Sequence, residues 1–304
     1  MQRETKSRIE YGAVRAIGLL VTFLPYRAAL AVGWFLARVS FLFMPKRVRE
    51  AERRIRIVFP EPYTPREVRR IAWISWRNIF FNSIEMMRYH RTTHEWIDSV
   101  SDCHPAMEVI QRHLATGKGA VIALPHMGAW DLSSVTCRMH GIPVFNISAM
   151  QKNPLIDDYI NRLRAEKGIY TVMRGAGTLK SVLKNIGEGQ VFAIMPDVRM
   201  KTEAIPVPFM GGEANVGAGM ASFARHADVP IFPASVLRIG WARHKITFLN
   251  PVVSDKSLDK KTDLQKMTAA VLEQFDAVIR RYPEQWFWFN KRWVLDPLDP
   301  PAQP

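Results

Sequence analysis

Short apolar runs alternate with amphipathic segments over most of the chain after residue 64. The run Gly119–Pro125 is continuously apolar, which is typical of a parallel strand that is covered by helices on both faces. Further strands are predicted over Pro143–Ala149, Ile169–Met173 and Gln190–Met195. Strands separated by helices build βαβ units, so the sequence predicts an α/β fold with a mostly parallel central sheet flanked by helices.

The predicted helices carry apolar residues at three- and four-residue steps, and several end at glycine. Pro65 opens the strongest of these patterns, which continues to Met87. The other helices are predicted at about 105–114, 131–140, 154–167, 178–186, 218–226 and 261–281, and two more strands at 230–237 and 245–249. No internal repeat or low-complexity stretch follows residue 60.

The N-terminal segment concentrates positive charge around apolar sequence. Residues 1–56 contain twelve Lys/Arg and four Asp/Glu, a net of +8 out of +14 for the whole chain. Two apolar stretches, Gly12–Leu24 and Ala28–Met44, are interrupted by Arg15 and Arg38, and neither reaches the ~20 clean apolar residues of a standard span. Aromatic-rich apolar segments flanked by arginine are typical of an element that lies in, or dips into, an anionic bilayer. A single span and a buried helical hairpin with a basic edge are the alternatives.

The simplest partition is therefore a basic, apolar, membrane-associated segment over residues 1–60, followed by one α/β domain over 61–304. Composition supports a folded core, since 48% of residues are hydrophobic and 23% are charged. The mean hydropathy of −0.09 excludes a polytopic membrane protein. The net charge of +14 points to an anionic partner: nucleic acid, acidic lipid or an acidic carrier.

The strongest candidate for chemistry follows the strand Gly119–Pro125. His126 leaves the strand in a turn that contains Gly128, and Asp131 begins the next helix. With a turn between them, the carboxylate can fold back onto one imidazole nitrogen while the other nitrogen takes a proton from a hydroxyl. The alternative is a buried histidine next to an ordinary N-cap aspartate.

Two other strand ends carry polar residues, Arg174 after Met173 and Asp197 after Met195. Ligands in such sheets bind beyond the carboxyl ends of the strands, so both residues are candidates for substrate binding.

Other chemistries lack their residues. The chain has no G-x-S-x-G nucleophile elbow, no H-E-x-x-H pair, no cysteine–histidine zinc spacing and no P-loop. Because no protein nucleophile accompanies His126, the nucleophile is expected to be the substrate's own hydroxyl. No metal and no cofactor are expected.

Six sequence blocks, in order, resemble a known family. His126 and Asp131 form an H-x4-D motif like that of glycerolipid and lipid A acyltransferases. The other blocks are N-P-L-I at 153–156, M-R at 173–174, M-P-D at 195–197, V-P-F-M-G at 207–211, and E-Q-W-F-W at 284–288 with K-R-W at 291–293. Over roughly residues 65–295 the chain resembles the lipid A late acyltransferases (lauroyl and myristoyl transferases), a family that includes mycobacterial phosphatidylinositol mannoside acyltransferases. It departs from the family at Val198, where glutamine is usual, and at 213–216, where P-A-x-T is common; both changes concern the acceptor or phosphate region.

The resemblance implies a role for each candidate residue. His126 would be the general base on an acceptor hydroxyl, and Asp131 would orient it. Backbone N–H groups near Gly128 would stabilise the tetrahedral oxyanion. Arg174 would bind a phosphate of the acceptor or of the donor's phosphopantetheine arm, with a salt bridge to Asp197 as the alternative. Asp197 occupies the position of a functional acid of the family.

The implied reaction moves a fatty acyl chain from acyl carrier protein or coenzyme A to a hydroxyl of an anionic glycolipid, without a covalent intermediate. The resemblance also implies attachment to the inner membrane with the active domain on the cytoplasmic face, and no nucleic acid as partner. Lys291, Arg292 and the basic N-terminus would hold acidic lipid or acidic carrier protein. The alternatives are a lysophosphatidate-type phospholipid acyltransferase (although its Glu-Gly-Thr motif is missing here), a basic nucleic-acid-binding protein, and a silent lipid-binding relative.

Overall fold

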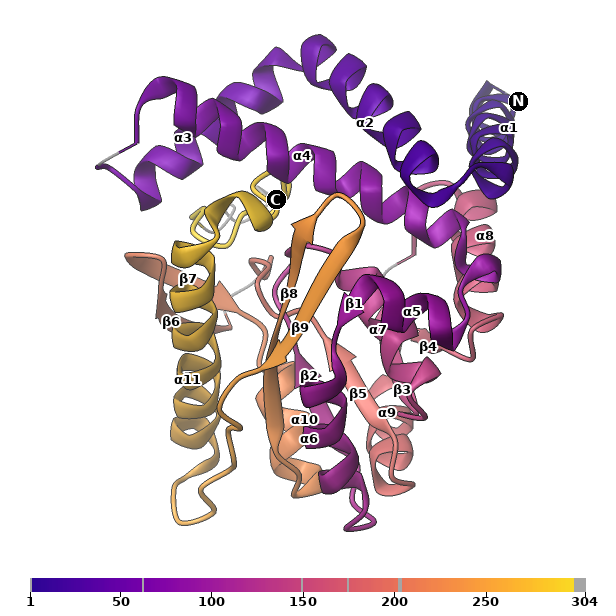
Figure 1. The fold of residues 1–304 in the computed structure, drawn as a ribbon. Helices are drawn as coiled ribbons and strands as arrows, with labels where there is room; N and C mark the ends of the chain where they lie inside the picture. Colours follow the sequence, from indigo (N-terminus) through magenta and orange to yellow (C-terminus); the bar gives the residue numbers. More distant parts are fainter. Residues whose placement is uncertain (1, 62, 149, 174, 202–203, 298–304) are drawn as a thin grey trace.

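The central element of the fold is a seven-stranded sheet with the strand order β1-β9-β8-β2-β5-β3-β4 (Figure 1). The computed structural model describes residues 2–61, 63–148, 150–173, 175–201 and 204–297. Neighbouring strands are parallel except for β8 and β9, which are antiparallel. The strands are β1 (Ser101–Asp102), β2 (Ala120–Ala123), β3 (Val144–Ser148), β4 (Tyr170–Met173), β5 (Val191–Ile194), β8 (Ile231–Gly240) and β9 (Arg243–Phe248). The predicted fold class is confirmed.

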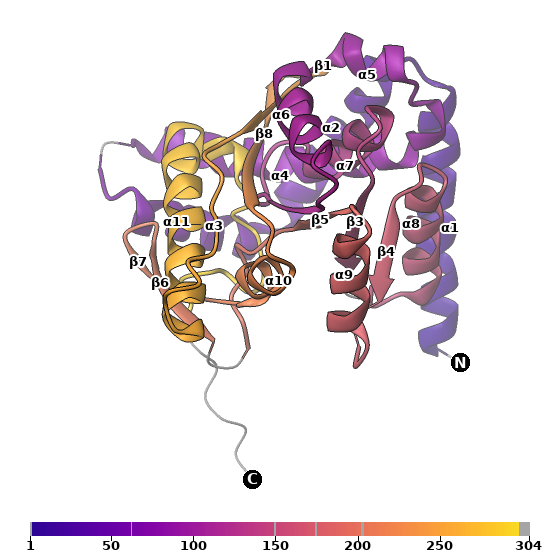
Figure 2. The same ribbon diagram turned by 90° about the horizontal axis from the view of Figure 1, so that it is seen from below.

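Helices cover both faces of this sheet (Figure 2). On one face, Ile122 and Val191 pack against the side of α6, α7 and α8, and on the other, Val121 and Phe192 pack against α9, α10 and α11. These helices are α6 (His104–Leu114), α7 (Trp130–Met139), α8 (Pro154–Ala165), α9 (Thr178–Gly187), α10 (Gly219–Ala227) and α11 (Lys260–Arg281); α5 (His94–Val100) is a short helix before β1. Each long helix predicted from the apolar spacing is present.

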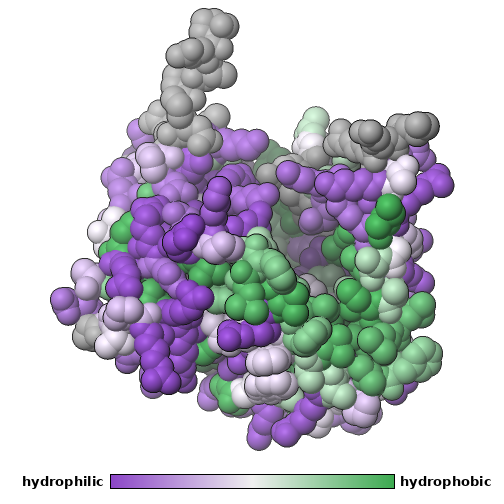
Figure 3. Space-filling model, turned by 90° about the horizontal axis from the view of Figure 1, so that it is seen from above, coloured by the Kyte–Doolittle hydropathy of each residue, from purple (hydrophilic) through white to green (hydrophobic). Residues whose placement is uncertain are grey.

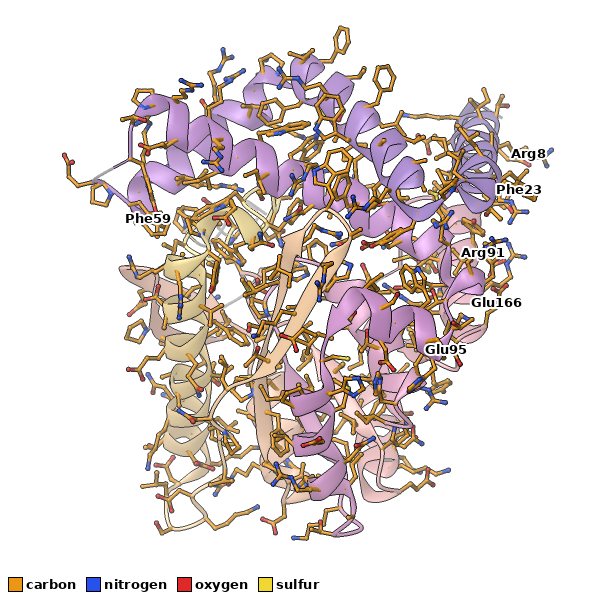
Figure 4. The ribbon with its side chains drawn as sticks, in the orientation of Figure 1. Arg8, Phe23, Phe59, Arg91, Glu95 and Glu166 are labelled. Carbon is orange, nitrogen blue, oxygen red and sulfur yellow. The ribbon has the colours of Figure 1, made fainter. Side chains whose placement is uncertain are left out.

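Four helices precede the sheet in the chain: α1 (Gln2–Phe23), α2 (Tyr26–Phe43), α3 (Pro45–Val58) and α4 (Pro65–Met87). Helices α2, α3 and α4 lie across the end of the sheet at which the β8–β9 hairpin turns (Figure 1). Helix α2 lies along α4 (Figure 1), and a Cβ atom added at Gly33 would come within 2.8 Å of the Ile84 side chain. Helix α1, on which Figure 4 labels Arg8 and Phe23, lies beside α8. The close packing at Gly33 requires glycine there.

In the sequence, the segment from Lys46 to Arg56 is a run of basic residues after the second apolar stretch, and the structure shows that it forms the amphipathic helix α3. Its buried residues Ile55 and Val58 join the core, and the guanidinium of Arg54 donates to the carbonyls of Trp288 (3.0 Å) and Asn290 (2.7 Å). Phe59, labelled in Figure 4, packs edge-on against Trp288, with the ring centroids 6.1 Å apart. The N-terminal helices therefore pack directly on the rest of the chain, and the partition at residue 60 stays a prediction.

The antiparallel hairpin of β6 (Ile205–Phe209) and β7 (Gly212–Val216) was not predicted. Met210 and Gly211 at its turn both have positive φ, 54° and 81°, as a two-residue turn between twisted strands requires. Two prolines in β6 hide the alternating strand pattern from the sequence.

A large apolar surface covers the outer side of α1 and α2, and Figure 3 shows it beside a hollow in the same face of the molecule. We call this surface the apolar face. Its side chains are exposed although they are large and hydrophobic: Ile9, Leu19, Leu20 and Phe23 on α1, and Trp34, Phe35, Val39, Leu42 and Phe43 on α2. Helix α2 is long and apolar enough to cross a membrane, with a mean hydropathy of 1.3 over 18 residues. Soluble proteins rarely leave so large a contiguous patch uncovered.

Candidate active site

His126 and Asp197 meet because β2 and β5 are parallel neighbours. Ala123, the last residue of β2, is in register with Ile194, the last residue of β5. His126 and Asp197 each follow three residues later, after Leu-Pro and Met-Pro respectively. Equal extensions from paired strand ends bring the two side chains to the same point above the sheet, where open α/β sheets bind their ligands.

The two side chains form a tight, buried pair. The Asp197 carboxylate accepts from the His126 ring at Nδ1 (2.7 Å) and from the His126 backbone N–H (2.8 Å), and its second oxygen also accepts from the indole of Trp286 (2.8 Å). Because the carboxylate can only accept here, Nδ1 carries the proton and the neutral ring presents its lone pair at Nε2. The His126 side chain is 20% exposed while that of Asp197 is 1% exposed, so only the imidazole is accessible to a ligand.

Burial and charge act in opposite directions on this pair. Burial lowers the pKa of His126, but the charge and hydrogen bond of Asp197, with a smaller contribution from Asp131, outweigh it and leave the pKa above its ordinary value. Burial raises the pKa of Asp197, but His126 and the hydrogen bond from Trp286 hold it below its ordinary value. Asp197 is therefore ionised, and the imidazole is a stronger base than an isolated one.

The structure contradicts the expectation that the Asp131 carboxylate contacts the His126 imidazole. Helix α7 begins at Trp130, and the carboxylate of Asp131 in its first turn pairs with Arg164 of α8 at 2.9 Å. The carboxylate at Nδ1 of His126 belongs to Asp197 instead. Asp131 still lines the same cavity and acts on His126 through its charge.

Gly128 shapes the loop after His126. Its φ is +57°, and a Cβ atom there would lie 2.0 Å from the carbonyl oxygen of Val236. Its N–H donates to the carbonyl of Gln285 at 2.9 Å, so this N–H is not available to a ligand. The role implied for Gly128 itself in oxyanion binding is therefore corrected: close backbone approach explains the glycine.

The segment 285–288 clamps this loop from the other side. Besides the bond from Gly128 to Gln285, the N–H of Phe287 donates to the carbonyl of His126 at 2.8 Å. Ser75 of α4 holds the segment in turn, because its hydroxyl donates to the carbonyl of Trp286 at 2.5 Å. Together with the bond from Trp286 to Asp197, these contacts fix both members of the pair, and they give the E-Q-W-F-W block a positioning role that the sequence alone did not reveal.

A cavity of about 580 Å³ opens next to the imidazole. Phe223 and Gly219 of α10 and Thr178 at the start of α9 line it, and these two helices lie on the same side of the sheet (Figure 2). The indole of Trp130 stands edge-on to His126, 5.6 Å between ring centroids. The polar groups that reach this mainly apolar cavity include His126, Asp131, Arg164, Thr178 and Arg292.

Two further residues, Arg174 and Arg292, are predicted to bind a charged group. Arg174 lies outside the described residues, so its binding role stays a prediction. Arg292, expected to hold an acidic partner, lines the cavity. Arg292 is therefore the one of the two that the structure places at the cavity.

A base–carboxylate pair at the carboxyl ends of parallel strands, beside a mainly apolar cavity, is typical of proteins that activate a hydroxyl group of a bound ligand. A family model described as bacterial lipid A biosynthesis acyltransferase matches residues 2–294. The chain belongs to this family, and the resemblance seen in the sequence is confirmed. The match includes the N-terminal helices α1 to α3.

Named relatives are distant. A phosphatidylinositol mannoside acyltransferase of Mycolicibacterium smegmatis is 23% identical over 61% of this chain and 60% of its own length, and a lipid A biosynthesis acyltransferase of Haemophilus influenzae is 24% identical over 60% and 56%. The chain thus spans less than two thirds of these two relatives. A lipid A biosynthesis lauroyltransferase of Escherichia coli is 24% identical over 93% of this chain and 91% of its own. Among solved structures, the 1-acyl-sn-glycerophosphate acyltransferase of Thermotoga maritima superposes with a TM-score of 0.38 and 14% identity, covering 88% of this chain and 98% of that one.

Proposed function

We propose that this protein is a membrane-associated acyltransferase that moves a fatty acyl chain from a thioester donor, acyl carrier protein or coenzyme A, to a hydroxyl of an anionic glycolipid. The observation that carries the proposal is the His126 imidazole, held at Nδ1 by a buried Asp197 and facing a cavity. Family membership supports the transfer of an acyl group to a lipid.

In the proposed reaction, Nε2 of His126 removes the proton from the acceptor hydroxyl as its oxygen attacks the thioester carbonyl carbon. Asp197 stabilises the imidazolium that forms. When the tetrahedral intermediate collapses, the C–S bond breaks and the imidazolium returns its proton to the leaving thiolate, so the enzyme ends in its starting state. No covalent link to the protein is required.

The oxyanion of that intermediate needs hydrogen-bond donors close to His126. Helix α7 starts at Trp130, four residues after His126, and among the described residues no side chain caps its N-terminus. The N–H groups in the first turn of an α-helix have no hydrogen-bond partner within the helix, and they carry partial positive charge. We assign the oxyanion donors to this turn, where each such bond contributes roughly 3 kcal/mol in other enzymes.

We propose further that the apolar face lies on the membrane. Helix α2 buries Ala29, Leu30 and Ala37 toward α4 and leaves its opposite side exposed, which suits a helix lying flat in the interface better than one crossing the bilayer alone. Exposed Arg27 and Lys46 flank it at the two ends. Attraction to an anionic lipid surface and burial of the apolar side chains would then act together, and the cytoplasmic face of the inner membrane is the proposed location.

This orientation can be measured with a double substitution, Phe35→Glu with Phe43→Glu. The two rings are 61% and 81% exposed, so the fold should be kept, while the loss of two buried rings in the membrane should weaken binding by at least about tenfold. Cosedimentation with vesicles of phosphatidylglycerol and phosphatidylethanolamine measures the effect. Val253→Glu, at a 67% exposed site outside α1 and α2, serves as the control and should bind as the parent does. Equal partitioning of all three proteins would contradict the proposed orientation.

The pH dependence of the reaction should reflect the raised pKa of His126. Only the neutral imidazole can act as base, so kcat/KM should fall as the pH drops through a value above the ordinary ~6.5 of histidine. Asp197→Asn removes the main group that raises this pKa and should move the acid limb to lower pH; Asp131→Asn should move it in the same direction by less. A limb that stays in place, or moves upward, in Asp197→Asn would contradict the assignment of His126 as the base.

The decisive experiment for substrate class is mass spectrometry of lipids from cells with and without this gene product. A glycolipid that gains the mass of one acyl chain only when the protein is present would support the proposal. A change confined to phosphatidic acid would favour the lysophosphatidate-type alternative, and no change in any lipid would favour a silent lipid-binding protein.

A further inference from the structure

Three histidines, one aspartate and one cysteine from separate helices meet at a point away from the cavity. His94 and Asp98 lie one turn apart on α5, Cys103 and His104 begin α6, and His140 caps the C-terminal end of α7. Helix α5 packs beside α7, and Figure 4 labels Glu95, the neighbour of His94. We call these five residues the histidine cluster; it lies at the opposite end of α7 from Asp131.

The cluster centres on the Asp98 carboxylate. Its oxygens lie 3.3 Å from Nδ1 of His94, 3.2 Å from Nε2 of His140 and 3.5 Å from Nε2 of His104. The ligand atoms of His94, Asp98 and His140 all lie within 4.8 Å of one another. Ligands at ~2.0–2.1 Å from a tetrahedral zinc ion are separated by about 3.3 Å, so the distances of 3.3 and 3.2 Å from the Asp98 carboxylate to His94 and His140 match such a site.

The hydrogen bonding of His140 points to a cation. Its Nδ1 lies 2.9 Å from the carbonyl oxygen of Thr136, which can only accept, so Nδ1 carries the proton. Its Nε2 faces Asp98 Oδ1 at 3.2 Å, and this buried oxygen has no hydrogen-bond partner within the described residues. A positive charge is needed between the two atoms, either a proton on Nε2 or a bound cation, and the missing hydrogen bond favours the cation. A histidine that donates its second N–H to a backbone carbonyl is also the usual arrangement of a metal ligand.

We propose that the histidine cluster is a zinc site, with His94, Asp98 and His140 as its three protein ligands. Imidazole nitrogen and carboxylate oxygen are ligands that Zn²⁺ prefers. The buried thiol of Cys103, whose sulfur lies 3.9 Å from Nε2 of His140, adds a soft donor beside it.

The bound ion would join α5 to the end of α7. Helix α5 has seven residues and β1 two, so this edge of the sheet has few backbone hydrogen bonds of its own. Zinc would hold α5 against the C-terminal end of α7, the helix whose other end lines the cavity. Because an ion that binds only the folded chain stabilises it, zinc should raise the midpoint of thermal unfolding.

The test uses the full chain, purified in detergent without a polyhistidine tag and stripped of metal with a chelator. Titration with zinc chloride, followed by calorimetry and by elemental analysis after dialysis, should give one ion per chain and a higher unfolding midpoint. His140→Ala and Asp98→Asn should each weaken zinc binding by at least about 100-fold. His94→Ala, at a 49% exposed side chain, gives the same test if His140→Ala fails to fold.

His226→Ala is the matched control. Its Nδ1 makes the same bond to a carbonyl four residues earlier, Ser222 at 2.7 Å, but it lies outside the histidine cluster. This variant should bind zinc as the parent does. Zinc retained equally by the parent, His94→Ala and His140→Ala would overturn the proposal, and so would a parent chain that takes up no zinc, which would leave an internally hydrogen-bonded cluster only. The readouts do not involve acyl transfer, so they stand whether or not the proposed function holds.

Discussion

Replacing His126 with alanine should lower the rate of acyl transfer by at least about 10³-fold, because a positioned general base contributes roughly 10²–10⁴-fold. The measurement is kcat with a radiolabelled acyl thioester and the glycolipid acceptor in mixed micelles. His126→Gln, which keeps most of the volume but cannot accept the proton at the same point, should be equally inactive.

The fold should survive both substitutions, because the backbone bonds of residue 126 to Asp197 and Phe287 remain. Circular dichroism and vesicle binding equal to those of the parent would show this. His226→Ala, an exposed histidine outside the cavity, should keep the parental rate. A His126→Ala enzyme that retains near-parental kcat would remove the basis of the proposed mechanism.

Replacing Asp197 with asparagine should be nearly as damaging, with a loss of about 10³–10⁴-fold in kcat, the size seen when the acid of a serine-protease triad is made an amide. The amide cannot stabilise the imidazolium, and its NH₂ group can favour the wrong tautomer of the ring. The bonds from the His126 backbone and from Trp286 to the second oxygen can persist, so the loss should appear in kcat more than in KM.

Asp131→Asn provides the contrast. Asp131 is paired with Arg164 and reaches His126 only through its charge, so its loss should be smaller than that of Asp197→Asn by at least about tenfold. Sequence spacing alone would assign the larger effect to Asp131. If Asp131→Asn proves the more damaging of the two, the pairing of His126 with Asp197 is not the catalytic arrangement.

The fold could be predicted because the core strands and helices carry clear local patterns. The run Gly119–Pro125 became β2, and the pattern opened by Pro65 became α4. The β6–β7 hairpin lacks such a pattern because two prolines and a polar partner strand blur the alternation. Helix α3 was missed because its arginines hide an apolar stripe that only packing reveals, as the buried Arg54 shows.

The sequence predicts which residues belong to the candidate site, but it does not predict which carboxylate pairs with His126. His126 and Asp197 were both singled out, yet the neighbour in sequence, Asp131, was preferred as the partner of the imidazole. The signal for the observed pairing was present: both residues follow an apolar strand and a proline at the same distance. Using it requires knowing that β2 and β5 are adjacent, and strand order is a tertiary property that no local pattern encodes.

The histidine cluster escaped the sequence for a related reason. Zinc motifs are recognised by close spacing along the chain, whereas His94 lies on α5, before the first strand, and His140 ends α7, after β2. The pair His94 and Asp98, one helical turn apart, was the only local sign, and such pairs are common on solvated helices.

The late position of the clamp at 285–288 has a consequence for biosynthesis. The loop of His126 is translated early. Residues 285–288, which hold both this loop and Asp197 in place, come after every strand of the sheet in chain order. With the apolar face on the membrane, as proposed above, a nascent chain can place its N-terminal helices on the lipid while its reactive centre is still unassembled. Chemistry begins only when nearly the whole polypeptide has left the ribosome, so prematurely terminated products should reach the bilayer as inert proteins.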